Sequence, residues 1–412
     1  MSLKKLQNSL FDEPPSYEKF YPKIESIQSD GVDINIWDIP YTIKQLSYLT
    51  HDHYRYYGKF PSAVAAQILK QHPPEKAGEY VLDNFCGSGT TLVEAKLRGI
   101  DSYGLDISWI SALVSNVKSN HFDIDKLNEI SLTIESRRNS ECYIPNDFDI
   151  GYAGKWFSES AIKDLLRIQV WLEELGGIKE RDFFLVGYLA IIRRVSYAFD
   201  AEVRPHVNKE KKERDVFDAF KKKIKDMLKS QIEFQSITNN KVISNCIVGN
   251  NINLPKKFND GLCYLAISHP PYLNSFNYRP VFSLEFFWGK PFEANYVENA
   301  HLGLIKSELV AHPANEVNTE KYFSHLVKCY KELYEAQDKN GKLAVVVGDC
   351  TRNGKLINVI GELIERISDL GYQPMEINYR TTHYGLGKYA YKERADYHGA
   401  AEKKDGIVIF KK

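Results

Sequence analysis

Two short stretches of the 412-residue chain combine residue types that could do chemistry. The first reads Asp83-Asn84-Phe85-Cys86-Gly87-Ser88-Gly89-Thr90. Its two glycines let the backbone turn sharply and approach a ligand with no Cβ in the way. Asp106 follows at about the distance of the acidic residue in many nucleotide sites, where it could accept hydrogen bonds from two ribose hydroxyls. The pattern indicates a nucleoside site.

The same turn narrows the class of nucleoside. It lacks the third glycine of the dinucleotide fingerprint and the Lys-Ser/Thr pair of a phosphate-binding loop. A nucleoside without a pyrophosphate therefore fits better, and S-adenosylmethionine is the commonest such ligand. The alternative is a tight strand-to-helix turn that binds nothing, and the placement of Asp106 favours a ligand over it.

The second stretch is Ser268-His269-Pro270-Pro271-Tyr272, directly after an apolar run over 262–267. Two prolines fix an extended backbone, and because neither has an N–H, the turn presents carbonyl acceptors only. Such acceptors could hold an exocyclic amino group, and the aromatic ring beside them could stack on the base that carries it. A base in a duplex must first be flipped out, and stacking worth roughly 1–3 kcal/mol per base helps to offset that cost.

Both stretches lie at the ends of predicted strands. A strand over 80–82, a helix over 90–97 and a strand over 102–105 form a βαβ unit, and a helix is predicted before it over 60–71. Further strand-like segments cover 244–250, 263–272, 342–350 and 406–412, and helical stretches such as 321–336 and 357–372 separate most of them. The pattern predicts an α/β fold with a mostly parallel, doubly wound, Rossmann-like sheet.

The rest of the chain divides by composition. Four prolines break residues 1–50, which we expect to form an N-terminal arm. Residues 121–240 carry apolar side chains at helical spacing, so we expect a helical insertion there. The insertion would interrupt one domain made of residues 51–120 and 241–412.

Composition excludes several classes of protein. Lys plus Arg and Asp plus Glu both number 54, so any nucleic-acid affinity must come from a local patch, not from a uniformly basic surface. Six cysteines lie scattered with no CxxC pair, which fits neither a zinc ribbon nor a disulfide scaffold. The sequence has no apolar run of the roughly 20 residues that span a bilayer and no signal-peptide core. We therefore expect a cytoplasmic protein without a membrane partner.

Taken together, DNFCGSGTT, YGLDIS and HPPY resemble motifs of the amino-methylating, S-adenosylmethionine-dependent DNA methyltransferases, which modify cytosine N4 or adenine N6. PPYLNSFNY resembles a variant common in the cytosine-N4 branch. Lys59-Phe60-Pro61 resembles the segment that closes over the methionine end of the cofactor. The resemblance covers 53–120, 244–290 and 342–412, and the order of its motifs is the one called gamma. It implies a Rossmann-like methyltransferase fold.

The resemblance also implies a set of site residues, with no metal among the requirements. S-adenosylmethionine would be bound by Lys59, Phe60, Pro61, Asp83, Phe85, Cys86, Gly87, Ser88, Gly89, Thr90, Asp106, Ile107 and Asn250, the last standing where the family more often has Asp. The catalytic turn would consist of Ser268, His269, Pro270, Pro271 and Tyr272. Cys86 would be a small packing residue there, because amine methylation needs no covalent intermediate.

Double-stranded DNA is the partner that the resemblance implies, and a cognate restriction endonuclease is left open as a second. The helical insertion over 121–240, with its basic stretch 204–229, is one candidate for the region that recognises DNA. Residues 289–320 together with 379–398 are the other. Arg193 and Arg194, inside an apolar helix, either pair internally or face the DNA.

His269 departs from the family's motif, which has Ser, Asp or Asn at this position. A neutral imidazole can accept one amino hydrogen while the carbonyl of His269 or Pro270 accepts the other. Because a protonated imidazole cannot accept a hydrogen bond, we expect activity to fall as the pH drops below the imidazole pKa of about 6.5. The alternatives are that only the carbonyls act, or that the site has lost catalysis.

The predicted function is therefore site-specific methylation of the N4 amine of a flipped cytosine in DNA. Adenine N6 is the first alternative, because both amines suit the same acceptors. An RNA amino-methyltransferase and a non-catalytic DNA-binding relative are the remaining two.

Overall fold

Within the part of the chain that the structure describes, nine strands build one sheet, and helices separate most of them along the sequence. The computed structural model describes residues 19–27, 31–258, 260–297, 308–382 and 404–412. The strands run in the order β1-β2-β10-β11-β7-β6-β3-β4-β5, and β8 and β9 form a separate two-stranded ribbon. Their bounds are β1 (Lys23–Ile27), β2 (Asp33–Ile39), β3 (Tyr80–Asp83), β4 (Ser102–Asp106), β5 (Ser244–Val248), β6 (Cys263–Ser268), β7 (Gln337–Gly348), β8 (Cys350–Arg352), β9 (Lys355–Ile357), β10 (Gln373–Thr382) and β11 (Asp405–Lys411).

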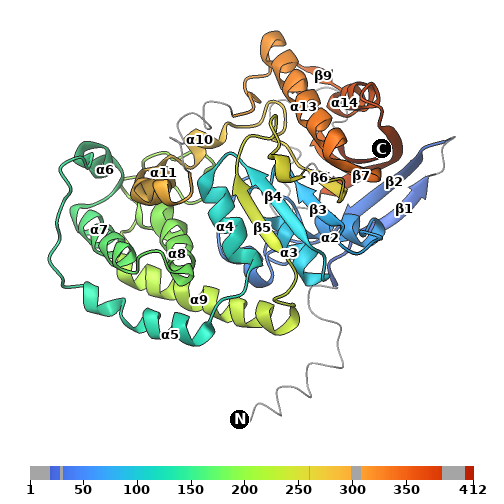
Figure 1. Ribbon diagram of the computed structural model, residues 1–412. Coiled ribbons are helices and arrows are strands. Elements are labelled where there is room, and N and C mark those ends of the chain that lie inside the picture. The colour runs from blue at the N-terminus through green and yellow to red at the C-terminus, as the bar shows by residue number, and fades with distance from the viewer. Residues whose placement is uncertain (1–18, 28–30, 259, 298–307, 383–403) are drawn as a thin grey trace.

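Helices flank the sheet on both faces and gather in a block to one side of it (Figure 1). Their bounds are α2 (Ser62–Gln71), α3 (Thr90–Leu97), α4 (Trp109–Ser119), α5 (Ile124–Leu132), α6 (Ile150–Trp156), α7 (Glu159–Glu174), α8 (Lys179–Val195), α9 (Val216–Ile237), α10 (Tyr278–Val281), α11 (Ser283–Gly289), α13 (Glu316–Ala336) and α14 (Val359–Ser368). Single 3₁₀ turns cover Leu49–Asp52, Glu135–Arg137, Lys256–Phe258 and Lys290–Asn295. Within the described ranges, none of the helices combines the length and apolar character that a membrane crossing would require.

The centre of the sheet is parallel, as the sequence predicts. Strands β5, β4, β3, β6 and β7 all pair in parallel. Strand β11 pairs antiparallel with both β7 and β10, and β2 then adds in parallel to β10. The predicted Rossmann-like α/β fold with a mostly parallel sheet is confirmed by this topology. In such sheets, ligands bind outside the carboxyl ends of the strands.

Alternating side chains of the central strands bury both faces of the sheet. In β3, Leu82 packs with α13 and α14 on one face, whereas Val81 packs with α2 on the other. In β6, Ala266 and Ile267 divide between the same two faces.

Residues 23–39 differ from the expectation of an arm. Strands β1 and β2 pair with each other, and β2 pairs with β10, so this part of the predicted arm belongs to the sheet. Its sequence does not reveal this, because β2 has a half-exposed pattern and takes one of its partners from a segment more than 300 residues away. Strand β10 was likewise not predicted from the sequence.

The predicted helical insertion contains α5 to α9, all between β4 and β5 in the chain. Its core includes Phe183 and Leu189 of α8, and it continues onto Trp109 and Ile110 of α4. Because α4 begins shortly after Asp106, the block is packed against an element that starts at the predicted nucleoside site. The division of the chain into an arm, a catalytic domain and a DNA-recognising insertion remains a prediction.

Candidate active site

The glycine-rich turn joins the end of β3 to the start of α3. Gly87 and Gly89 have positive φ values of 51° and 73°. A Cβ on Gly89 would come within 2.8 Å of Ser115, so glycine is required there by both backbone conformation and space. At the end of β3, the Asp83 carboxylate accepts hydrogen bonds from the Phe85 N–H at 3.1 Å and the Thr91 hydroxyl at 2.5 Å. The turn is thereby held around a buried acid.

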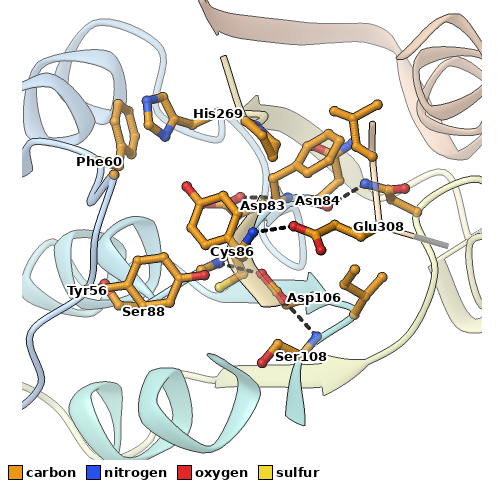
Figure 2. A pocket seen from close by; sticks show the side chains of 18 of the residues that line it. Tyr56, Phe60, Asp83, Asn84, Cys86, Ser88, Asp106, Ser108, His269 and Glu308 are labelled. Atoms are coloured by element: carbon orange, nitrogen blue, oxygen red, sulfur yellow. Dashed lines mark hydrogen bonds between the residues drawn. The ribbon is translucent and has the colours of Figure 1, made fainter. Parts of the chain in front are cut away.

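Asp106 occupies the end of the neighbouring strand β4 and is tied to the same turn. One carboxylate oxygen accepts the Gly87 N–H and the other accepts the Ser108 N–H, each at 2.8 Å (Figure 2). Burial raises the pKa of Asp106 to about 6 and that of Asp83 to about 7. Two acids with raised pKa values at adjacent strand ends are typical of a functional site.

The Ser268–Tyr272 turn follows β6, which lies next to β3 with Asp83 opposite Ile267. The Ser268 hydroxyl donates to the Tyr330 hydroxyl at 3.4 Å, and the Pro271 carbonyl accepts the Tyr322 hydroxyl at 3.0 Å. Helix α13 therefore holds one side of the turn. Among the described residues, no hydrogen bond reaches the carbonyls of His269 and Pro270, which leaves them as acceptors.

The His269 ring lies on the opposite face, stacked on Phe60 with ring centroids 4.9 Å apart and planes 19° from parallel (Figure 2). Burial, and secondarily the charge of Arg380, lowers its pKa to about 3. The expected loss of activity through His269 protonation near pH 6.5 is therefore wrong, since this imidazole stays neutral well below that pH. A neutral ring is the form that can accept an amino hydrogen.

The Tyr272 side chain points toward Asp405. Its hydroxyl donates to the Asp405 carboxylate at 2.8 Å, and its ring lies against Gly348, where a Cβ would approach it to 2.8 Å. Its ring meets that of His269 edge-on, with centroids 5.4 Å apart. The Tyr272 ring, which was predicted to stack on the base, therefore does not line the cleft.

A cleft of about 990 Å³, part of it open to solvent, brings the two predicted constellations together. The predicted residues that line it are Lys59, Phe60, Asp83, Phe85, Cys86, Gly87, Ser88, Thr90, Asp106, Ile107, His269 and Pro271. The predicted residues that do not line it are Pro61, Gly89, Asn250, Ser268, Pro270 and Tyr272. Gly249 and Asn251, the neighbours of Asn250, line it instead.

Several lining residues were not predicted from the sequence, among them Tyr56, Asn84, Asn251, Tyr278, Phe282, Glu308 and His325. The rings of Tyr56 and Tyr278 stack at 5.7 Å, and Phe282 lies parallel to Tyr278 at 6.3 Å. Asn84 and Tyr278 lie inside recognised motifs and could have been proposed. Glu308, whose carboxylate accepts the Tyr278 N–H, has no local sequence signal.

The cleft offers the groups that S-adenosylmethionine needs. Asp83 provides a buried carboxylate for a cationic ligand, and Asp106 provides a partly buried one for a ribose-bearing ligand. The Lys59 ammonium donates to the His51 carbonyl at 2.9 Å, and burial lowers its pKa to about 8, so a carboxylate such as that of a methionine moiety suits it. The side chains of Asn84 and Thr90 are buried with no hydrogen-bond partner among the described residues. Buried polar groups normally have partners, so these observations fit a polar ligand.

The basic residues proposed for DNA recognition are partly used within the protein. Arg193 is buried and donates to the Tyr57 hydroxyl at 2.6 Å and to three backbone carbonyls, so it pairs internally. Lys211 and Arg214 form ion pairs with Asp200. Arg194 is exposed. Of the second candidate region, residues 298–307 and 383–398 lie outside the described residues.

Comparison with known proteins supports the resemblance. Residues 13–113 match the model of the N6/N4 methyltransferase family, described as DNA methylase. This segment includes the glycine-rich turn and Asp106 but ends before the Ser268–Tyr272 turn.

Three type II methyltransferases are similar to parts of the chain. M.MjaII of Methanocaldococcus jannaschii is 32% identical over 31% of this chain and 25% of its own length. M.MvaI of Kocuria varians is 27% identical over 55% and 54%, and M.BsoBI of Geobacillus stearothermophilus is 24% identical over 66% and 60%. The matches thus span between a quarter and three fifths of these relatives. The resemblance indicated by the sequence is confirmed at this level: residues 13–113 are similar to the amino-methylating DNA methyltransferases, and longer parts of the chain are similar to type II methyltransferases.

Proposed function

We propose that this protein transfers a methyl group from S-adenosylmethionine to an exocyclic amino group of a base in DNA, with cytosine N4 as the target. One observation carries the proposal. The glycine-rich turn at the end of β3 and the His-Pro-Pro turn at the end of β6 line the same cleft. A donor and an acceptor bound there would be oriented next to each other, and orientation of two reactants can supply much of a rate enhancement.

In this assignment the cofactor lies across the ends of β3 and β4. Asp106 accepts hydrogen bonds from the ribose hydroxyls while it continues to hold the Gly87 and Ser108 N–H groups. Asp83 lies buried beside the turn, where a nearby positive charge would favour its ionised form. Lys59 faces the carboxylate of the methionine moiety. S-adenosylmethionine supplies an electrophilic methyl group on a sulfonium.

The acceptor amine is held by the turn at the end of β6. Its two hydrogens bond to the neutral His269 ring and to the carbonyl of His269 or Pro270. These bonds would draw the nitrogen toward a tetrahedral shape and localise its lone pair on nitrogen, directed at the methyl carbon. The N–C bond would form as the S–C bond breaks, S-adenosylhomocysteine would leave, and the methylated amine would release one proton to solvent water. Acceptors placed in advance stabilise the positive charge that develops on nitrogen.

Cytosine is preferred over adenine because PPYLNSFNY resembles the cytosine-N4 variant and because neither Asp nor Asn precedes Pro270. The helical block formed by α5 to α9 is the region that we assign to DNA recognition. It packs on α4, so it is fixed relative to the cleft. Phosphate contacts there would set affinity, and base-edge contacts would set sequence preference.

Mass spectrometry of nucleosides from a host without DNA methylation, expressing the protein, tests the proposal. We expect N4-methylcytosine in the DNA, and we expect its loss in the Asp106→Asn variant. N6-methyladenine alone would refute the cytosine assignment. Radiolabelled transfer in vitro to total RNA but not to duplex DNA would refute DNA as the substrate. Binding of duplex DNA with no transfer to either would indicate a non-catalytic relative.

A further inference from the structure

The carboxamide of Asn84 is an unused polar group in the wall of the cleft. The residue retains only 1% of its exposure, and neither its Nδ2 nor its Oδ1 atom has a hydrogen-bond partner among the described residues. It nevertheless lines the cleft, next to Asp83 (Figure 2). Leaving a donor and an acceptor both buried and unpaired is costly, so such a group calls for a partner that enters from the cleft.

Asn84 is the first residue beyond β3. Asp83, the last residue of that strand, bonds Thr91 of α3. Ser268, the last residue of the neighbouring strand β6, bonds Tyr330 of α13. Because Asp83 lies opposite Ile267, Asn84 is level with the start of the His-Pro-Pro turn. It therefore belongs to the first predicted stretch and lies beside the second.

The backbone at Asn84 is held in place from the far side of β4. The Asn251 Nδ2 donates to the Asn84 carbonyl at 3.3 Å, and the Asn251 Oδ1 contacts the His325 Nε2 at 3.3 Å. Both of these partners also line the cleft. The chain from α13 through Asn251 thus fixes the backbone of Asn84 while its carboxamide stays unpaired. Such an arrangement preorganises a binding group.

We propose that Asn84 is a ligand-binding residue that recognises the amidine edge of a nucleobase, where a ring nitrogen stands beside an exocyclic amino group. The carboxamide oxygen accepts one amino hydrogen, and the carboxamide nitrogen donates to the ring nitrogen. Asn binds adenine through a comparable two-point contact in DNA recognition. This edge is shared by the adenine of the cofactor and by an extruded cytosine or adenine. The inference rests on the proposed function and extends it to a residue not previously assigned.

The test replaces the carboxamide with an apolar group of similar size. Asn84→Leu removes the unpaired donor and acceptor, so we expect the thermal midpoint of the ligand-free protein to rise or stay unchanged. Asn378→Leu is the matched control, because Asn378 is fully buried in β10 but accepts a hydrogen bond from Asn35 Nδ2 at 2.7 Å. It should lower the midpoint without changing ligand affinity. Asn84→Ala provides a second variant in case leucine does not fit.

Calorimetric titration then shows whether Asn84 binds the adenine of the cofactor or the target base. The two ligands are S-adenosylhomocysteine and S-inosylhomocysteine, in which a 6-oxo group replaces the amine. If Asn84 reads the cofactor, the wild type prefers the adenosyl compound, and both Asn84 variants lose that preference with at least tenfold weaker binding. If it reads the target base, affinity for S-adenosylhomocysteine stays within twofold while kcat/KM for unmethylated DNA falls at least tenfold.

Both results support the inference. Unchanged affinity together with unchanged kcat/KM would overturn it and would leave Asn84 a residue satisfied by water alone. A wild-type protein that binds neither compound and transfers no methyl group would overturn the proposed function, and the inference with it. The two failures are thereby distinguishable, because only the second affects the wild type.

Discussion

Replacing Asp83 with Asn should stabilise the ligand-free protein, and the gain should depend on pH. Burial raises the pKa of this carboxyl to about 7, against an ordinary value of about 3.9 in an unfolded chain. The folded state therefore binds the proton more tightly than the unfolded state. Stability is lost as the pH rises from about 4 to about 7 and stays reduced above that range. Asn imitates the protonated form, so it avoids this loss.

The magnitude follows from the same pKa values. The difference between the folded and unfolded pKa values of Asp83 lowers the unfolding free energy by at most about 4 kcal/mol above pH 7. Somewhat less than half of this loss is already present at pH 5. The carboxamide introduced by Asp83→Asn can still accept the Phe85 N–H and can donate to the Thr91 hydroxyl, so both existing contacts have a replacement. The variant should therefore be more stable than the wild type, and this gain in unfolding free energy should be about 2 kcal/mol larger at pH 8 than at pH 5.

Urea denaturation of both proteins at pH 5 and pH 8 measures this difference, and the pH 5 pair serves as the internal control. The stabilised variant should also bind S-adenosylmethionine more weakly at pH 8, because it lacks the negative charge opposite a cationic ligand. A gain in stability that is equal at the two pH values would refute the reasoning from burial. So would a loss of stability at pH 8.

Two further predictions concern the catalytic turn and the glycine-rich turn. Burial lowers the pKa of His269 to about 3. The methyl-transfer rate of the wild type divided by that of His269→Gln should therefore stay constant from pH 8 to pH 5. A ratio that falls as the pH drops through about 6.5 would show that the imidazole titrates there. Gly89→Ala should cost about 2 kcal/mol or more in urea denaturation and weaken S-adenosylhomocysteine binding, since its φ is 73° and a Cβ would meet Ser115 at 2.8 Å. Gly154→Ala, in helix α6 with open space around it, should instead be neutral or stabilising, and equal losses in the two variants would contradict the packing argument.

Part of the fold could be predicted because its signals are local. The strand over 80–82 and the helix over 90–97 match β3 and α3 closely, since apolar spacing and the intervening glycines belong to one short segment. The β8–β9 ribbon was missed although Asn353-Gly354, both with positive φ, is a recognised hairpin signal. Strands β2 and β10 have no comparable signal, because each becomes a strand through pairing with a remote segment.

Local sequence accounts for the chemical groups that this protein can present to a ligand. Gly87 and Gly89 fix a turn that approaches a ligand, Asp106 supplies acceptors, and Pro270 with Pro271 removes donors from a strand end. Each of these properties follows from a residue type and its immediate neighbours.

Which side chains face the cleft depends on the tertiary structure. Asn251 holds the Asn84 backbone while the Asn84 carboxamide has no partner among the described residues, the bond to Asp405 draws Tyr272 away, and desolvation of the His269 ring beside Phe60 keeps it neutral. These outcomes depend on partners brought together from distant parts of the chain. Orientation and burial are properties of that assembly, whereas hydrogen-bonding capacity is a property of each residue.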